Sequence, residues 1–302
     1  MKDKVLILGT NGFVGNEVLQ YFLKKKIKVS YFFRIKKNSN SRSNFKKIKN
    51  LILNNDIIIN CIGENFNKKK MNQNNYIFLK RIIDLINSFK KKKFLIHLSS
   101  AAVYGKYFHK KNFKISINTP PHPISLYAIT KLKADSYLIN NSFKYNFVIL
   151  RPSQVIGKKM KAAGFINLIK FIKLRLFFFI NNFESIRNYV MVDDLCKIIF
   201  YFCINKKSIN NKIYIVSRFS KLINIFNYIK QKSNIKFFPT IVLPKILVLN
   251  ILNIISFFKK NFVVNKDIIE GLSTSTIINS NVNKIVNIKF KSIYPYLNYL
   301  LK

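Results

Sequence analysis

The sequence predicts an α/β fold in which a doubly wound parallel sheet carries a smaller, mostly helical C-terminal lobe. Over the first 157 residues, short β-rich runs alternate with helical segments, as in a parallel sheet covered by helices on both faces. The β-rich runs lie at 4–8, 27–33, 56–61, 93–98 and 146–150, and the helical segments at 13–25, 72–89 and 125–141. A hydrophobic content of 49% is ample for a buried core.

A glycine-rich turn follows the first β-rich run and leads into the first helical segment. Gly9, Gly12 and Gly15 account for three of the eight glycines in the chain. Glycine permits a tight turn and lets backbone N–H groups approach a pyrophosphate, which the positive end of a helix attracts. The turn therefore predicts the phosphate site of a dinucleotide; a purely structural turn is the alternative.

The second β-rich run ends at Arg34. An acid at this place would accept hydrogen bonds from ribose hydroxyls, whereas a cation suits a 2′-phosphate, so Arg34 favours NADP over NAD. The alternative is that Arg34 is an ordinary surface cation. The interval before the next run, which includes the polar stretch 36–44, is short, and a full helix–strand unit barely fits there. We expect a trimmed or absent third strand.

The run 93–98 ends at Ser99-Ser100, and the segment 125–141 carries Tyr127 and Lys131. Residues four apart share one face of a helix. For Tyr127 to exchange a proton near neutrality, the pKa of its phenol must fall by about three units, or about 4 kcal/mol. A nearby ammonium and an oxidised nicotinamide can supply this stabilisation. The spacing predicts a hydride-transfer site; Tyr127 as an ordinary half-buried aromatic is the alternative.

After residue 157 the alternation ends. The sequence predicts an amphipathic helix over 158–180, a strand at 212–216, and helices over most of 218–302. We expect residues 1–157, completed by about 190–216, to form a dinucleotide-binding domain. Residues 158–189 and 217–302 would form the second lobe.

The composition is strongly basic, with 54 Lys and Arg against 11 Asp and Glu, a net charge of +43. Such a charge attracts nucleic acid, anionic membranes or anionic substrates. The alternative is genome bias, because Lys, Asn and Ile share A/T-rich codons. We expect no specific nucleic-acid partner.

The apolar stretches 174–180 and 246–258 are too short to cross a bilayer. The segment 165–180, with Phe177, Phe178 and Phe179, is expected either to contact a membrane surface or to cover the second lobe.

Cysteine and histidine spacing predicts neither a disulfide framework nor a metal site. Cys61, Cys196 and Cys203 form no CxxC pair, and the three histidines lack ligand-like spacing. The chain opens directly into a β-rich run without a signal-peptide pattern. We therefore expect a cytoplasmic protein.

Taken in order, these motifs resemble those of extended short-chain dehydrogenase/reductases of the NAD(P)-dependent nucleotide-sugar epimerase/dehydratase type, which have a Rossmann-type fold. The resemblance runs from residue 4 to about 216, and the last 85 residues match only loosely. The matching segments are 9–15, Asn60-Cys61-Ile62-Gly63, Asn75 at the opening of a helix, 97–105, 127–131, Leu150-Arg151-Pro152 and 187–194.

The resemblance implies a role for each matching residue. Tyr127 is the general acid/base, Lys131 holds the nicotinamide ribose and lowers the phenol pKa, and Ser100 orients the reacting hydroxyl or ketone. Arg187 grips a substrate diphosphate, and Asp194 is a structural helix cap. The implied cofactor contacts are Gly9, Asn11, Gly12, Phe13, Gly15, Asn60, Gly63 and Lys131, with Arg34 added from its position.

The chain departs from the family pattern at three places. Gln154 replaces an asparagine near the substrate, so sugar contacts at this position are in doubt. Ala101-Ala102 replaces the Asp-Glu pair of sugar 4,6-dehydratases, which disfavours dehydration. The trimmed region 36–55 loses the acid that usually touches adenine.

Two classes of function remain open. The first is an epimerase or ketoreductase transferring hydride at C4 of a nucleotide-diphosphate sugar, in cell-surface polysaccharide biosynthesis and acting as a homodimer. The stretch 100–105 favours an epimerase, and Arg34 favours a reductase. The second is a non-catalytic dinucleotide-binding scaffold or sensor that associates with RNA or anionic membrane through its charge.

Overall fold

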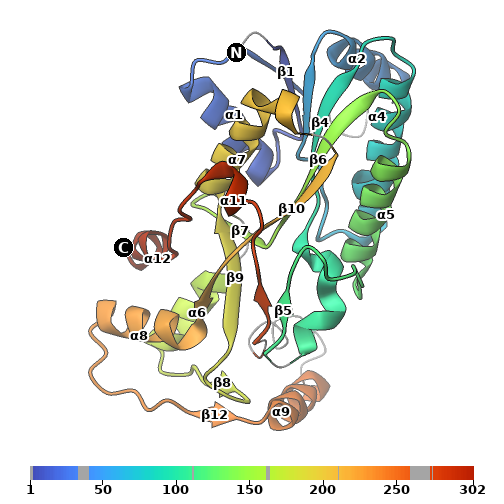
Figure 1. Ribbon diagram of the computed structural model, residues 1–302. Coiled ribbons are helices and arrows are strands. Elements are labelled where there is room, and N and C mark those ends of the chain that lie inside the picture. Colours follow the sequence, from blue (N-terminus) through green and yellow to red (C-terminus); the bar gives the residue numbers. More distant parts are fainter. Residues whose placement is uncertain are drawn as a thin grey trace.

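Figure 1 shows the computed structural model of the chain, with the parallel sheet at one end and the second lobe at the other. The structure describes residues 3–32, 41–110, 112–160, 164–209, 211–258, 273 and 275–302. The strands are β1 Val5–Leu8, β2 Val29–Phe32, β3 Ile57–Asn60, β4 Lys93–Leu98, β5 Lys114–Ile115, β6 Tyr145–Pro152, β7 Gln154–Ile156, β8 Phe179–Ile180, β9 Ile186–Met191, β10 Lys212–Val216, β11 Arg218–Lys221, β12 Val242–Leu243 and β13 Ile277–Ile278.

The helices follow the same chain order. The α-helices are α1 Phe13–Lys24, α2 Ser41–Leu53, α3 Lys68–Met71, α4 Phe78–Asn87, α5 Leu126–Asn140, α6 Gly164–Lys173, α7 Val192–Ile204, α8 Leu222–Lys232, α9 Lys245–Phe258, α11 Asn283–Val286 and α12 Tyr294–Leu301. A π-helical turn, η1 Asn72–Ile77, joins α3 to α4. Two 3-10 segments are η2 Ala101–His109 and η3 Lys206–Ser208.

The central sheet has six parallel strands in the order β10-β6-β4-β3-β1-β2. Its strands are short apolar runs such as Val5–Leu8, which is buried throughout because helices cover both faces. Alternate residues of β1 face opposite cores: Val5 and Ile7 pack with α1 and α7, whereas Leu6 and Leu8 pack with α2, α4 and α5. This arrangement confirms the predicted Rossmann-type α/β fold.

β2 forms one edge of the central sheet, as expected of a fold with a trimmed third strand. In the described part of the interval between β2 and β3, which begins at residue 41, the chain forms α2 and no strand. Ile48 and Ile52 on α2 are buried against the sheet. From residue 41 onward, α2 is the element that carries the chain back to β3.

The second lobe contains strands that the sequence analysis does not predict. β11, β9 and β7 form a three-stranded sheet beside α6, α8 and α12. One residue separates β6 from β7 and β10 from β11, so two strands leave the central sheet and continue into this smaller one (Figure 1). The helix expected over 158–180 is wrong in extent: α6 ends at Lys173, and residues 179–180 form β8.

The core of the lobe is aromatic. Phe177 and Phe179 lie 5.5 and 5.4 Å from Phe226, measured between ring centroids, and both are buried. These two rings are therefore core residues, and neither offers a membrane contact. In the described ranges no helix has both the length and the apolar character to cross a bilayer.

Candidate active site

The glycine turn adopts the conformation that its sequence predicts. Gly9 has a φ of +89°, and a side chain there would bring Cβ within 2.9 Å of Ile62 Cγ1. A Cβ at Gly15 would overlap the carbonyl oxygen of Gly9, so only glycine lets α1 approach the turn this closely. Gly12 caps α1 without a side-chain hydrogen bond, and no acid lies in the first helical turn. The turn fits a dinucleotide pyrophosphate on these grounds.

The remaining cofactor candidates are placed around this turn. Asn11 is exposed and Phe13 is half-buried, with its ring 2.9 Å from the place of a Cβ on Gly157. Gly63 follows β3, and a Cβ there would lie 3.2 Å from Lys131 Nζ, so glycine allows the lysine to reach this loop. Arg34, the residue on which the NADP preference rests, lies outside the described residues.

Tyr127 and Lys131 lie one turn apart on α5, which begins after Ser125. The Ser125 hydroxyl accepts a hydrogen bond from the Ala128 N–H at 3.2 Å and caps the helix. The Tyr127 phenol is hydrogen-bonded to the side chain of Ser100, a residue that lies just beyond β4. The structure therefore brings together the three residues predicted to be catalytic.

Lys131 lies beneath this pair and is 3% exposed. Its ammonium donates to the carbonyl of Leu98 at 2.8 Å and to that of Ile62 at 3.5 Å. Leu98 ends β4, and Ile62 belongs to the loop after β3. The lysine thus joins the loop near the glycine turn to the strand that carries Ser100.

The electrostatics of the site differ from the sequence prediction in one respect. Burial lowers the pKa of Lys131 to about 8, although the Asp135 carboxylate opposes the shift. Burial also raises the pKa of the Tyr127 phenol, and the hydrogen bond to Ser100 only partly offsets this. The lowering expected from Lys131 is therefore absent among the protein's own groups, because the ammonium is directed at two carbonyls.

A buried ion pair that the sequence analysis missed lies behind the catalytic residues. Asp135, one turn beyond Lys131, accepts hydrogen bonds from Ser99 Oγ at 2.9 Å and from Arg151 Nε at 3.0 Å. Arg151 also donates to the Tyr104 hydroxyl at 2.7 Å. The spacing of Tyr127, Lys131 and Asp135 at intervals of four residues is the signal that could have revealed it.

Asn60 and Asn75 position backbone segments. Asn60 is buried; its side-chain oxygen accepts the Ile62 N–H at 3.2 Å, and its amide lies 3.1 Å from His97 Nδ1. Asn75 was expected to open a helix. It lies instead within the π-helical turn η1. There it donates to Thr130 Oγ1 at 2.9 Å and accepts the Glu64 N–H at 2.7 Å, linking the loop after β3 to α5.

The candidates for substrate contact other than Ser100 lie on the small sheet. Gln154 is exposed on β7, which pairs with β9, the strand that carries Arg187. Arg187 is half-buried, and desolvation lowers the pKa of its guanidinium to about 10. Asp194 does not cap α7; it is buried and accepts the backbone N–H of Lys291 at 2.6 Å, a structural role.

Within the described ranges, no three His, Cys, Asp or Glu side chains gather as a metal site would require.

Comparisons with known proteins place this geometry in a family. No curated protein sequence matches the chain. The structure resembles UDP-glucuronic acid 4-epimerase from Bacillus cereus in complex with NAD, at 16% identity and a TM-score of 0.69, covering 98% of this chain and 96% of that one. It also resembles RMD from Pseudomonas aeruginosa complexed with NADPH, at 14% identity and a TM-score of 0.70, covering 99% and 98%.

A third similar structure is the ADP-L-glycero-D-manno-heptose-6-epimerase of Helicobacter pylori, at 16% identity and a TM-score of 0.70, covering 99% of this chain and 95% of that one. At these identities the likeness is one of fold. The family model described as "NAD dependent epimerase/dehydratase family" matches residues 5–217, which is most of the chain. Since this match includes the glycine turn, Ser100, Tyr127 and Lys131, the chain belongs to the NAD-dependent epimerase/dehydratase family.

Proposed function

We propose that the protein is an NAD(P)-dependent epimerase or ketoreductase that transfers hydride at C4 of a nucleotide-diphosphate sugar. The observation that carries this proposal is the position of Lys131, which reaches the carbonyls of Ile62 and Leu98 one turn below the Tyr127–Ser100 hydrogen bond. A comparable fold binds UDP-glucuronic acid and NAD in the Bacillus cereus 4-epimerase, which supports the substrate class.

In the proposed mechanism Tyr127 moves the proton. When a sugar hydroxyl is oxidised, its proton passes to the Tyr127 phenolate oxygen, which becomes the phenol, while Ser100 holds the same substrate oxygen by a hydrogen bond. The bound nicotinamide supplies the hydride acceptor or donor. Lys131 would hold the nicotinamide ribose. Reduction of a ketone runs the same proton transfer in reverse.

The raised pKa of Tyr127 restricts when this proton moves. Burial favours the neutral phenol, so the chain alone leaves Tyr127 protonated near neutrality. Positive charge from an oxidised nicotinamide would favour the phenolate in the loaded enzyme. Proton transfer would therefore be coupled to binding of the oxidised cofactor.

Epimerase and ketoreductase differ in how long they hold the dinucleotide. An epimerase returns hydride to the opposite face and retains its cofactor, whereas a ketoreductase exchanges it after each turnover. The residue pattern at 100–105, which has Ala101-Ala102 and no acid pair, disfavours dehydration. Dinucleotide bound to the purified protein distinguishes the two: retention through gel filtration supports an epimerase, and free exchange supports a reductase.

The substrate is identified by a screen of UDP-, GDP- and dTDP-sugars with NADH, NADPH and their oxidised forms. Absorbance follows net oxidation or reduction, and product chromatography detects epimers. Conversion of a nucleotide sugar at C4 supports the proposal. Dinucleotide binding without conversion of any sugar would favour the scaffold or sensor function instead.

We propose NADP as the preferred cofactor on the basis of Arg34 in the sequence. Arg34→Asp should weaken NADP binding more than NAD binding, because it removes the cation expected beside the 2′-phosphate. Titration of both dinucleotides measures the ratio of their affinities. An unchanged ratio would refute the preference.

We also propose that the protein is a cytoplasmic homodimer that serves polysaccharide biosynthesis. α4 and α5 pack side by side on one face of the sheet, and Leu126, Ile129 and Ile139 of α5 are exposed. Light scattering gives the oligomeric state. A monomer at working concentration would refute the dimer.

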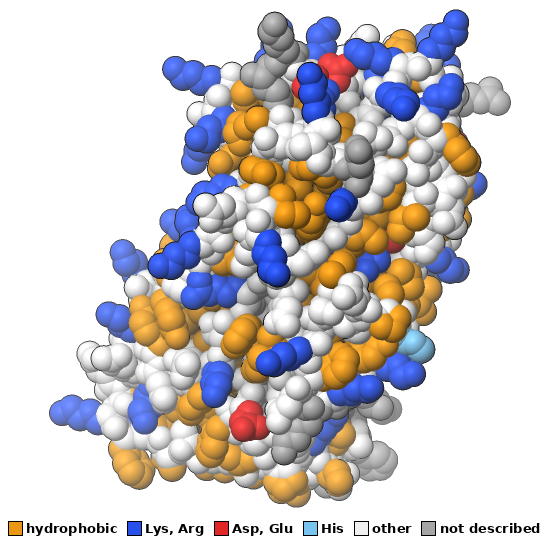
Figure 2. All heavy atoms as spheres, in the orientation of Figure 1, with side chains coloured by type: hydrophobic (Ala, Val, Ile, Leu, Met, Phe, Trp, Pro, Cys, Tyr) orange, Lys and Arg blue, Asp and Glu red, His pale blue; other side chains and the backbone are white. Residues whose placement is uncertain are grey.

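Membrane contact is a second candidate function, which the outer surface of α6 and the following turn favours. Phe171, Leu174 and Leu176 are 49%, 55% and 61% exposed there, among the cations Lys170 and Lys173. Figure 2 shows cations over the whole visible face, with few acids, so charge alone marks no single site. Sedimentation with anionic and neutral vesicles tests the idea; Leu174→Ser should reduce binding to anionic vesicles.

A further inference from the structure

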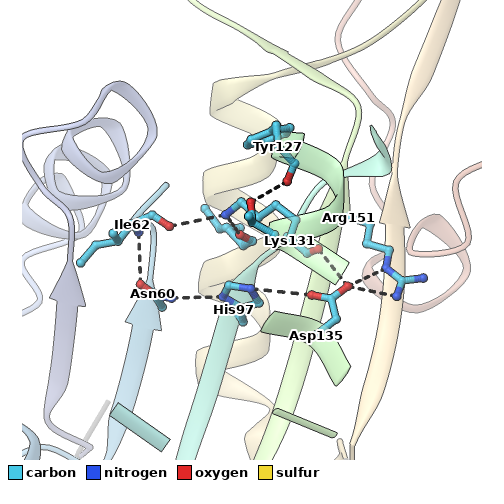
Figure 3. A network of polar contacts seen from close by, with 10 residues as sticks. Asn60, Ile62, His97, Tyr127, Lys131, Asp135 and Arg151 are labelled. Carbon is cyan, nitrogen blue, oxygen red and sulfur yellow. Dashed lines mark hydrogen bonds and ion pairs between the residues drawn. The ribbon is translucent and has the colours of Figure 1, made fainter. Parts of the chain in front are cut away.

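A polar residue crosses the apolar centre of the sheet beneath the catalytic helix. His97 lies on β4 within the run Lys93–Leu98, and its side chain is fully buried. Its Nδ1 is 3.1 Å from the Asn60 amide, and its Nε2 is 3.7 Å from Asp135 Oδ1. Figure 3 shows the three side chains in line from β3 to α5. His97 therefore joins two elements that pack on either side of β4.

The hydrogen bonds assign the protonation of His97. The Asn60 side-chain oxygen accepts the Ile62 N–H at 3.2 Å, so the amide nitrogen is the group that faces His97. That nitrogen is a donor, and His97 Nδ1 must accept from it. Burial, with the charges of Lys131 and Arg151, holds the pKa of His97 well below its usual value, so the ring is neutral. Its proton is then on Nε2, facing Asp135.

The contact between His97 and Asp135 lowers the stability of the folded chain, so packing alone does not account for a histidine here. His97 Nε2 and Asp135 Oδ1 are both buried, and neither has a hydrogen-bond partner among the described residues. At 3.7 Å they attract each other without forming a full hydrogen bond. An apolar residue at 97 would leave no ring nitrogen unpaired, and its neighbours Leu95, Ile96 and Leu98 are all apolar. Histidine at position 97 is therefore less favourable for the free energy of folding than an apolar residue of similar size would be.

Both ends of the line reach Lys131. At one end, Asn60 fixes the Ile62 N–H, and the carbonyl of the same residue accepts from Lys131 at 3.5 Å. At the other end, Asp135 lies one turn beyond Lys131 on α5 and attracts its ammonium. The position of the lysine therefore depends on the separation of this loop from α5.

We propose that His97 is a positioning residue, which through Asn60 and Asp135 holds the loop after β3 and α5 at the separation at which Lys131 spans the dinucleotide loop and the catalytic strand. The inference deepens the proposed function and rests on it only for the cofactor-binding readout. Among the described residues, the polar contacts of His97 are with Asn60 and Asp135, so its proposed role is to position other groups.

The proposal has a consequence for pH. The groups that face Lys131 are Asp135 on the same helix, Cys61 on the loop after β3, and His97 on β4, with Arg151 on β6 behind Asp135. When the loop after β3 moves away from α5, the Lys131 ammonium loses the Ile62 carbonyl as an acceptor, so its charged form is less stabilised. Lys131 then deprotonates at a lower pH.

The test compares His97→Gln with His97→Asn. The Gln side chain presents an acceptor and a donor that reach both partners, whereas Asn is one methylene shorter and reaches one of them. The exposed His122→Gln is the matched control. NADH and NADPH fluorescence gives dinucleotide affinity between about pH 6 and pH 10, a range that brackets the titration of Lys131. Amide hydrogen exchange reports opening of residues 60–63 and of α5.

We expect His97→Asn to weaken dinucleotide binding at least about tenfold at neutral pH. The pH at which affinity is half lost should also fall, and exchange at 60–63 and α5 should rise. His97→Gln and the control should resemble the parent in all three readouts.

Equal affinity, pH midpoint and exchange in His97→Asn and His97→Gln would overturn the proposal, even if both variants melt at a lower temperature. If the parent binds neither dinucleotide, the proposed function fails on its own account. Hydrogen exchange then still decides whether His97 positions the loop and the helix.

Discussion

Lys131 shows how one buried side chain serves the site at a cost to stability. Burial lowers its pKa to about 8, so the folded chain binds fewer protons than the unfolded chain between about pH 8 and the ordinary value of 10.5. The free energy of unfolding should therefore rise with pH across this window. Below pH 8 the full cost of the buried ammonium is present.

Replacing this ammonium should stabilise the protein while removing function. Lys131→Met should raise the free energy of unfolding at pH 7 by about 1–3 kcal/mol and abolish dinucleotide binding, and the stabilisation should shrink by pH 10. Urea denaturation at both pH values measures it. The exposed Lys133→Met is the control and should change stability little. A variant less stable than the parent at pH 7 would contradict this account.

At the scale of single residues, the sequence predicts the catalytic residues better than it predicts the residues that support them. Ser100, Tyr127 and Lys131 follow from local spacing, and the structure brings them together. Asp135 and His97 were missed because their partners, Arg151 and Asn60, are distant in sequence. A tertiary ion pair has no local signal beyond its helical spacing.

At the scale of elements, the approach of α1 to β1 depends on a missing side chain. A Cβ at Gly15 would overlap the Gly9 carbonyl, whereas a Cβ at Gly164, the first residue of α6, would meet no atom of the described residues within 4 Å. Gly15→Ala should lower the free energy of unfolding by about 1–3 kcal/mol and weaken dinucleotide binding at least about tenfold. Gly164→Ala should do neither.

Chemical denaturation and dinucleotide titration of the two glycine variants check this prediction side by side. Because both changes add one methyl group near a helix start, helix propensity contributes similarly to each. Equal behaviour of the two variants would show that the tight contact at Gly15 is unimportant.

The elements also differ in how well their sequences predict them. β1 and β3 are apolar runs that can only be buried, and they were predicted within one residue. β9 spans Ile186–Met191, and Arg187 and Asn188 interrupt its apolar residues, so no continuous apolar run predicts the strand. β7 and β11 each follow a longer strand after a single residue, and nothing in composition marks the change of sheet.

At the scale of the whole molecule, a net charge of +43 must act against the folded state. Like charges repel across a compact surface more than along an expanded chain, and salt screens this repulsion. The melting temperature should therefore rise by several degrees between about 10 mM and 0.1 M sodium chloride, as the Debye length falls from about 30 to about 10 Å. Scanning calorimetry measures this shift; a melting temperature that fell with salt would contradict it.

The whole molecule also depends on contacts that the sequence could not reveal. Asp194 at the start of α7 accepts the Lys291 N–H, and the Tyr189 hydroxyl accepts the Ile293 N–H at 3.0 Å. These bonds attach the C-terminal segment, whose sequence matches the family only loosely, to the strand and helix that follow the site. Only the folded chain shows that this segment belongs beside β9.

The central claim is that Tyr127 transfers the proton beside the dinucleotide while Lys131 and the glycine turn hold the cofactor. The most direct test is hydride transfer by Tyr127→Phe, measured with the sugar that the screen identifies, alongside dinucleotide affinity. The account predicts affinity within about threefold of the parent and turnover lower by about two to four orders of magnitude. Turnover at the parental rate with intact binding would contradict it.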